Sequence, residues 1–172
     1  LFERLGAMGP KSTERDGRTR AWPATAIVNA DDPHADPFAA AGLAAGARLI
    51  RYGTGSDAEV RATSVAEDAR RLTVGVEAPG WRGELALRLA GRFNVHNALA
   101  VVALGEALGL DPEAVRAGLE ALPGVPGRME RIDAGQPFGV VVDYAHSPAS
   151  LEKVLAILAP LAAARGGGLV AV

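Results

Sequence analysis

The chain has 172 residues, of which 49% are hydrophobic and 22% charged, a composition that can bury a core and excludes a disordered or fibrous protein. The formal net charge of −2 argues against nucleic acid or a membrane surface as a partner, because bulk electrostatics would attract neither. The absence of cysteine excludes disulfides, thiolate nucleophiles and Cys-ligated zinc, and no apolar run is long enough to cross a membrane, so we expect a cytoplasmic protein.

The first part of the chain predicts a helix end, a loop and then a parallel unit. Residues 1–6 indicate the end of a helix, and the charged residues 9–20, with glycine and proline, indicate a loop. The β-branched run 25–29 and the run 48–52 predict two strands, with an alanine-rich helix at 39–45 between them. Strand, helix and strand at this spacing favour a parallel βαβ unit.

The middle of the chain changes to a period of two and then to helices. Residues 59–89 alternate apolar with polar positions, which predicts antiparallel strands with one face toward solvent. The apolar run 95–108 is too long for a strand and predicts a buried helix, with Asn94 as its N-cap. Asp111 followed by Pro112 predicts the start of another helix.

Two prolines and two glycines within residues 123–127 predict a linker and a domain boundary. Beyond it, residues 138–142 predict a strand, residues 148–159 an amphipathic helix and Leu169 the start of another strand. The expected fold class is therefore α/β. A central domain combines a parallel sheet with antiparallel strands and is followed by the start of a Rossmann-like, doubly wound domain. Because the chain stops inside an apolar run, we expect a fragment of a longer protein.

Asparagines at the start of the buried helix allow two interpretations. Asn94 and Asn97 could cap the helix and satisfy a neighbouring backbone group. Alternatively, an amide presents a donor and an acceptor that match the N6/N7 edge of adenine. His96 between them is interpreted as a packed or surface histidine rather than as a ligand.

Polar residues also follow the apolar strand in the second domain. Ligands of open parallel sheets bind at the carboxyl ends of strands, where Asp143 and His146 lie, and a carboxylate suits ribose hydroxyls. The alternative makes Asp143 a turn residue and Ser147 a helix cap. Arg128, just after the linker, is either a surface charge or a group that grips a nucleotide when two domains close.

Three segments in order resemble the ATP-dependent Mur ligase family, and within it the branch that adds the third residue of the peptidoglycan stem peptide. They are Gly91-Arg92-Phe93-Asn94-Val95-His96-Asn97, Val125-Pro126-Gly127-Arg128-Met129-Glu130 and Val142-Asp143-Tyr144-Ala145-His146-Ser147-Pro148. Residues 29–33, Asn-Ala-Asp-Asp-Pro, are also similar to a strand end of that family. The resemblance covers nearly the whole chain.

The resemblance implies a three-domain enzyme with a P-loop-type ATPase domain at its centre. Residues 1–124 would be the second half of that domain, and residues 125–172 the beginning of the C-terminal domain. The implied cofactors are ATP and Mg²⁺, and the implied partners are UDP-MurNAc-L-Ala-D-Glu and a diamino acid. The phosphate loop, catalytic lysines and metal ligands of the family have no counterpart in this chain, so we assign it no catalytic or metal residue and expect no ligase activity from it alone.

By motif, the resemblance implies a role for five residues in binding the nucleotide. Asn97 would contact adenine and Asn94 would brace the start of the helix. Arg128 would reach ribose or phosphate, Asp143 would hold the ribose, and His146 would line the same cleft. We therefore expect Asn97, Arg128 and Asp143 to converge around one adenosine.

Two other functions share much of this pattern. A folylpolyglutamate or cyanophycin synthetase has a similar motif, although Tyr144 and residues 127–130 favour the muramyl branch. A non-catalytic nucleotide-binding domain of the same fold is the other alternative. The third amino acid, meso-diaminopimelate, lysine or ornithine, stays open.

Overall fold

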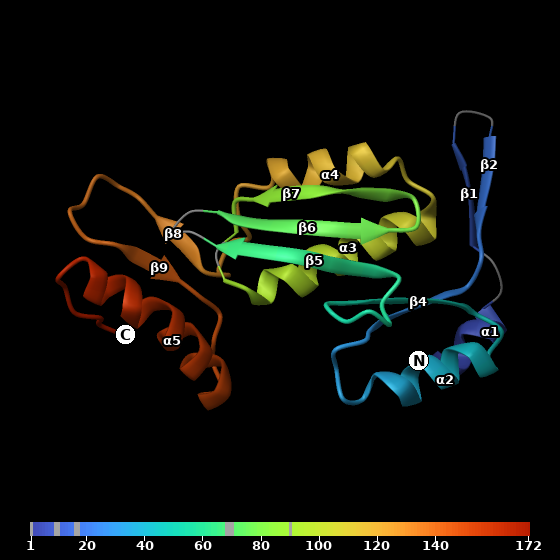
Figure 1. The fold of residues 1–172 in the computed structure, drawn as a ribbon, viewed down its shortest axis with the longest axis horizontal. Coiled ribbons are helices and arrows are strands. Elements are labelled where there is room, and N and C mark those ends of the chain that lie inside the picture. The colour runs from blue at the N-terminus through green and yellow to red at the C-terminus, as the bar shows by residue number, and fades with distance from the viewer. Residues whose placement is uncertain (1, 9–10, 16–17, 68–70, 90) are drawn as a thin grey trace.

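The computed structural model describes the whole chain except residues 1, 9–10, 16–17, 68–70 and 90. Its central strands are β3 (Thr25–Asn29), β4 (Arg48–Gly53), β5 (Val60–Glu67), β6 (Leu72–Ala78) and β7 (Trp81–Leu87). They form one sheet in the order β3-β4-β5-β6-β7 (Figure 1). β3, β4 and β5 run parallel, whereas β5, β6 and β7 run antiparallel. The predicted combination of a parallel unit with antiparallel strands is confirmed.

Helix α2 (Ala35–Ala44) connects β3 to β4 and completes the predicted βαβ unit. It begins at Ala35 rather than at the predicted residue 39. Pro37 lies in its first turn, where the missing N–H of proline has no helical partner to lose. The alanine-rich run predicted the later part of this helix, but it did not predict the first turn, which contains proline.

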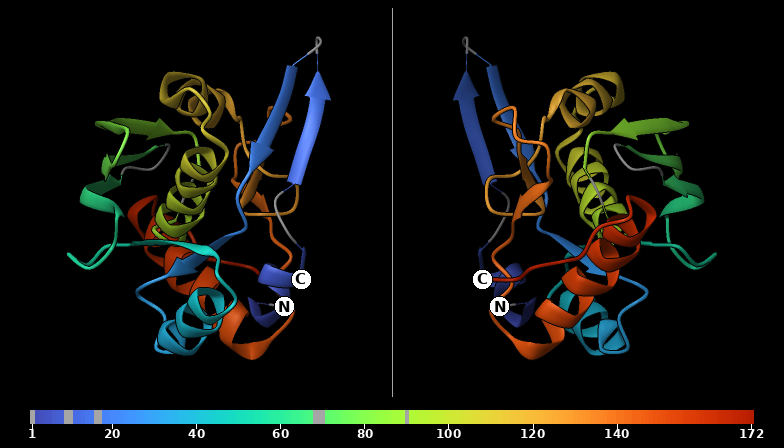
Figure 2. Two further views of the ribbon diagram at one scale, coloured as in Figure 1. Left: turned by 90° about the vertical axis from the view of Figure 1, so that its right-hand side faces the viewer. Right: turned by 90° about the vertical axis from the view of Figure 1, so that its left-hand side faces the viewer.

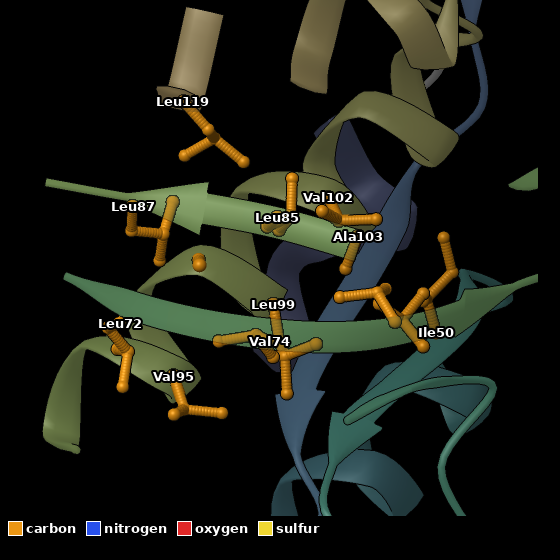
Figure 3. Close-up of a cluster of buried hydrophobic side chains, with 13 residues drawn as sticks. Ile50, Leu72, Val74, Leu85, Leu87, Val95, Leu99, Val102, Ala103 and Leu119 are labelled. Carbon is orange, nitrogen blue, oxygen red and sulfur yellow. The ribbon is translucent and has the colours of Figure 1, made fainter. Parts of the chain in front are cut away.

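Helix α3 (Phe93–Leu108) packs on the sheet and supplies much of the core. In Figure 3 its buried side chains, Leu99 among them, meet those of β6 and β7. Leu72, Leu85 and Leu99 are 0% exposed. Burial of each such side chain contributes about 1.5–3 kcal/mol. This packing holds α3, and therefore the asparagines in its first turn, in a fixed position on the sheet.

The start of α3 corrects the predicted helix cap. The helix begins at Phe93, so Asn94 lies inside its first turn, and Arg92 occupies the N-cap position. Gly91 turns the chain into the helix with a positive φ of 91°, and its carbonyl accepts the Asn94 N–H at 3.0 Å. The glycine makes this turn, and no side chain caps the helix. The predicted capping role of Asn94 is wrong.

Helix α4 (Pro112–Ala121) follows α3 and begins as predicted. Asp111 is its N-cap, and Asp111 Oδ1 accepts the Glu113 N–H at 3.2 Å. Gly105 in α3 allows the two helices to approach closely, because a Cβ there would lie 2.8 Å from Val115 Cγ2. Helix α4 lies beside β7, where Glu120 Oε1 accepts the Ala86 N–H at 3.1 Å.

The N-terminal residues form short helical segments and a hairpin. The segments are η1 (Phe2–Arg4) and α1 (Leu5–Met8), so the predicted helix end is confirmed and reaches Met8. The loop predicted for residues 9–20 is wrong in its described part, which contains the antiparallel strands β1 (Lys11–Arg15) and β2 (Arg18–Trp22). The far ends of these strands extend away from the sheet (Figures 1 and 2).

The hairpin is held by contacts that a local pattern does not reveal. Trp22 Nε1 donates to the Leu108 carbonyl at 2.8 Å, and the Arg20 guanidinium donates to the Gly109 carbonyl, both at the end of α3. The strands themselves are largely polar and show no apolar alternation. Their pairing therefore depends on a helix end far along the chain.

The last part of the chain contains strands β8 (Glu130–Ile132) and β9 (Val140–Val142) and helix α5 (Pro148–Ala164). β8 and β9 pair antiparallel. Ser147 caps α5, which continues past Pro160, and none of its residues is buried. The strand predicted from Leu169 is wrong: residues 167–172 form neither helix nor strand, so only β9 and α5 of the expected βαβ unit are present. A strand needs a neighbour for its backbone groups, and the partner of β9 is β8.

Among the described helices, none combines the length and apolarity required to span a membrane.

Candidate functional site

Asn94 and Asn97 form a pair at the start of α3. The Asn97 Nδ2 donates to Asn94 Oδ1 at 3.0 Å, Asn94 is 8% exposed, and Asn97 is exposed. An amide has two hydrogens and one oxygen, so this bond leaves one N–H and Oδ1 of Asn97 for a further partner. That combination of donor and acceptor matches the N6/N7 edge of adenine.

Asp143 lies directly after β9 and connects two loops. Its Oδ2 accepts the Met129 N–H and its Oδ1 accepts the Ala145 N–H, each at 2.8 Å. The Tyr144 N–H donates to the Gly127 carbonyl at 2.7 Å, which holds the same two loops together. Asp143 is therefore a turn-stabilising residue. Because a carboxylate has about four acceptor positions, it can also accept hydroxyl groups of a ligand.

Arg128 and His146 lie on either side of the exposed Tyr144 ring. The Arg128 guanidinium carbon is 5.8 Å from the ring centroid, within the range of a cation–π contact. The His146 ring meets the Tyr144 ring edge-on, with centroids 5.0 Å apart, and His146 Nδ1 lies 2.9 Å from the Tyr144 carbonyl oxygen. The loops bonded by Asp143 thus present a guanidinium, a carboxylate and an imidazole.

The start of α3 and the end of α4 lie at the same end of the antiparallel strands. Glu67, at the end of β5, accepts the Gly91 N–H at 2.9 Å. Glu120, near the end of α4, bonds to Ala86 near the end of β7. Leu72 pairs with both Glu67 and Leu87, which places those strand ends side by side. The chain runs on from α4 toward β8 at this end (Figure 1). Convergence of Asn97 with Arg128 and Asp143 on one nucleoside stays a prediction.

A second group of polar residues escaped the sequence reasoning. His96 Nε2 lies 2.7 Å from Asp31 Oδ2, which also accepts the Thr54 N–H at 2.8 Å and the Thr54 hydroxyl at 2.9 Å. Asp31 follows β3 and Thr54 follows β4, so both lie at the carboxyl ends of parallel strands. Gly53 allows this approach, because a Cβ there would lie 2.7 Å from Asp31 Oδ1. The neighbouring strand ends were a signal for the contact of Asp31 with Thr54, but nothing local connected either to His96.

The Asp31 carboxyl is ionised at neutral pH. Partial burial acts to raise its pKa, but the hydrogen bonds from His96 and Thr54 outweigh burial, so the pKa lies below its ordinary value of 3.8. A carboxylate accepts hydrogen bonds from both groups, and the bonds to an ionised acceptor are the stronger kind. The contact therefore ties the first turn of α3 to the ends of two strands.

A magnesium site is not assigned to this chain. Within the residues that the structure describes, no three histidine or acidic side chains gather closely enough to hold a metal ion. The acidic residues described above are instead engaged by backbone N–H groups, Thr54 and His96.

Comparison with known proteins identifies the family. The description "Mur ligase middle domain" matches residues 18–105, which is half of the chain and includes β3 to β7 and most of α3. The chain belongs to the Mur ligase family. Mur ligase chains in solved structures have the same fold: MurF from Acinetobacter baumannii superposes with a TM-score of 0.70 at 27% identity, over 79% of this chain and 29% of that one.

Curated relatives within the Mur ligase family are more similar in sequence. UDP-N-acetylmuramyl-tripeptide synthetase of Roseiflexus sp. is 47% identical over 136 residues, which are 79% of this chain. UDP-N-acetylmuramoyl-L-alanyl-D-glutamate–2,6-diaminopimelate ligase of Bacillus licheniformis is 40% identical over 155 residues, 90% of this chain. The chain spans only 26% and 29% of the lengths of these two relatives.

Proposed function

We propose that this chain is the adenosine-binding part of an ATP-dependent ligase that adds a diamino acid to UDP-MurNAc-L-Ala-D-Glu in peptidoglycan synthesis. The observation that carries the proposal is the 40% identity to the Bacillus licheniformis ligase over 155 residues. A continuous alignment of that length spans residues 18–155 wherever it begins, so it contains all five candidate residues. The cytoplasm is the proposed location, because both ATP and the UDP-linked precursor are cytoplasmic nucleotides.

The contacts in the structure support a separate role for each of the five residues in binding the nucleotide. The free amide N–H and oxygen of Asn97 bind the adenine edge, and Asn94 holds the Asn97 side chain through the 3.0 Å bond. Asp143 accepts the ribose hydroxyls, while its bonds to Met129 and Ala145 keep it in place. Arg128, exposed beside Tyr144, contacts ribose or phosphate, and His146 lines the same cleft.

In the proposed reaction, the D-glutamyl carboxylate attacks the γ-phosphorus of ATP and ADP leaves. The amine of the incoming diamino acid then attacks the acyl phosphate carbonyl, and the tetrahedral intermediate expels inorganic phosphate as the amide bond forms. Residues of this chain contribute by orientation: holding adenine and ribose fixes the direction of the γ-phosphate toward the carboxylate. No residue of the chain is assigned to the bond-making steps.

The test uses the full-length protein that contains this chain. Purified protein is incubated with ATP, magnesium and UDP-MurNAc-L-Ala-D-Glu, together with meso-diaminopimelate, lysine or ornithine in separate reactions. Phosphate release and a tripeptide product of the matching mass are expected with one of the three. Phosphate release with a folate and glutamate would instead support the folylpolyglutamate alternative. Nucleotide binding with no turnover on any acceptor would support a non-catalytic domain.

A further inference from the structure

His96 links the first turn of α3 to the turn that follows β3. It lies on α3 between Asn94 and Asn97, and its Nε2 contacts the carboxylate of Asp31, 65 residues earlier in the chain. Both side chains are partly exposed, with 35% of the His96 side chain and 26% of the Asp31 side chain accessible to solvent. Its neighbour Asn97 is exposed and holds the amide proposed to meet adenine.

The Asp31 side of the contact is held by its own bonds. The Thr54 N–H and hydroxyl both donate to Asp31 Oδ2, and the Asp31 N–H donates to Asn29 Oδ1 at 3.1 Å. The preceding residue, Ala30, is also hydrogen-bonded. Its N–H donates to the Tyr52 carbonyl at 2.7 Å and extends the pairing of β3 with β4. His96 thus contacts a turn that is hydrogen-bonded to the ends of β3 and β4.

This anchor controls the rotation of the first turn of α3. A side-chain end about 6 Å from a helix axis moves about 1 Å when the helix turns by about 10°. Misplacement by about 1 Å is enough to weaken a directed contact by up to about 100-fold. The packing of Val95 and Leu99 in the core restrains the buried side of α3, and the contact of His96 with Asp31 adds a polar restraint to its first turn.

We propose that His96 and Asp31 are positioning residues that aim the Asn97 amide at the adenine base and thereby set the preference of the enzyme for adenine. This inference rests on the proposed function. Neither residue contacts the nucleotide. Their effect passes through the first turn of α3, so their loss weakens recognition of the base edge and leaves recognition of ribose and phosphate unchanged.

The experiment compares two nucleotides that differ only at the base edge. The full-length protein is titrated with ADP and with purine riboside diphosphate, which lacks the N6 amino group, so that the Asn97 amide oxygen loses its donor and only the bond to N7 remains. A bidentate amide–adenine pair corresponds to about 5- to 150-fold of discrimination, so wild-type protein is expected to bind ADP at least about fivefold more tightly. His96→Leu is expected to reduce this ratio toward one by weakening ADP binding more than it weakens binding of the analogue.

Three further variants accompany His96→Leu. His34→Leu removes an exposed histidine that contacts Asp32 in the neighbouring loop, and it is expected to leave the ratio unchanged. His96→Gln retains an N–H that can reach Asp31, and it is expected to restore most of the wild-type ratio. Thr54→Val removes only the hydroxyl bond to Asp31 and is expected to lower the ratio partially.

A purely structural role for His96 would lower the affinity for both nucleotides equally, and that result overturns the proposal. The same conclusion follows if His96→Leu retains the wild-type ratio. Should His96→Leu fail to fold, an unchanged ratio in Thr54→Val overturns it. A wild-type protein that lacks any preference for ADP also refutes it, because Asn97 then does not read the base. Since binding is measured without an acceptor, absence of ligase turnover would count against the proposed function alone.

Discussion

Replacement of Asp143 by asparagine tests the proposed nucleotide site at a residue whose contacts the structure defines well. Both carboxylate oxygens accept a backbone N–H at 2.8 Å, from Met129 and from Ala145. Asparagine has one acceptor oxygen and an NH₂ group, so one of the two N–H groups would face another donor. Loss of a hydrogen bond to a charged acceptor costs about 1.5–3 kcal/mol. That range corresponds to about 10- to 150-fold in an equilibrium constant.

We expect Asp143→Asn to weaken ADP binding by about this factor, because the ribose loses a charged acceptor and the loop with Arg128 loses its tie to β9. Isothermal titration of full-length protein with ADP measures it. Asp133→Asn is the matched control, since Asp133 also accepts a backbone N–H, from Gly135 at 3.2 Å, in an exposed loop. Its effect should stay within about twofold. Wild-type affinity in Asp143→Asn, or an equal loss in both variants, would refute the reasoning.

Three further predictions concern stability, pH and the isolated chain. Leu99→Ala should lower the free energy of unfolding by about 2–5 kcal/mol in urea titrations, because it opens a cavity at a fully buried site. Leu104→Ala on the same helix, 47% exposed, should cost far less, and equal losses would contradict the observed packing. The lowered pKa of Asp31 contributes stability above its ordinary value of 3.8 that is lost as the pH falls through the folded-state pKa. Thermal unfolding should therefore show a smaller loss of stability below about pH 4 in Asp31→Asn than in the wild type, and parallel curves would contradict this. The 172-residue chain alone should form no tripeptide in a phosphate-release assay, and turnover would contradict this prediction.

Local patterns predicted most of the secondary structure because burial imposes a period on the sequence. β3 and β4 were found from β-branched runs, and β5 to β7 from the alternation that a half-buried sheet requires. The cap and proline at the start of α4 were equally local signals. Where the predictions failed, a distant partner decided the structure. The largely polar hairpin β1–β2 is held by the end of α3, and the run from Leu169 forms no strand without a neighbour.

In the candidate site, too, local patterns identified some residues, whereas their contacts depend on the rest of the fold. Asp143 could be picked out because a carboxylate follows an apolar strand, and Asn94 and Asn97 because two amides stand three positions apart at the start of an apolar helix. Such positions are properties of neighbouring residues. The contact that each side chain makes is not such a property: Gly91 makes the turn into α3, and Asn94 accepts a hydrogen bond from Asn97 instead of capping the helix.

By itself, the amino-acid sequence determined the order and type of the main elements and indicated candidate residues for binding an adenine nucleotide, because these depend on side-chain chemistry and short-range periodicity. Only the tertiary structure decided that Asp31, Thr54 and His96 meet at the ends of two parallel strands. Their contact spans 65 residues and arises from the packing of α3 on the sheet, which no local pattern encodes.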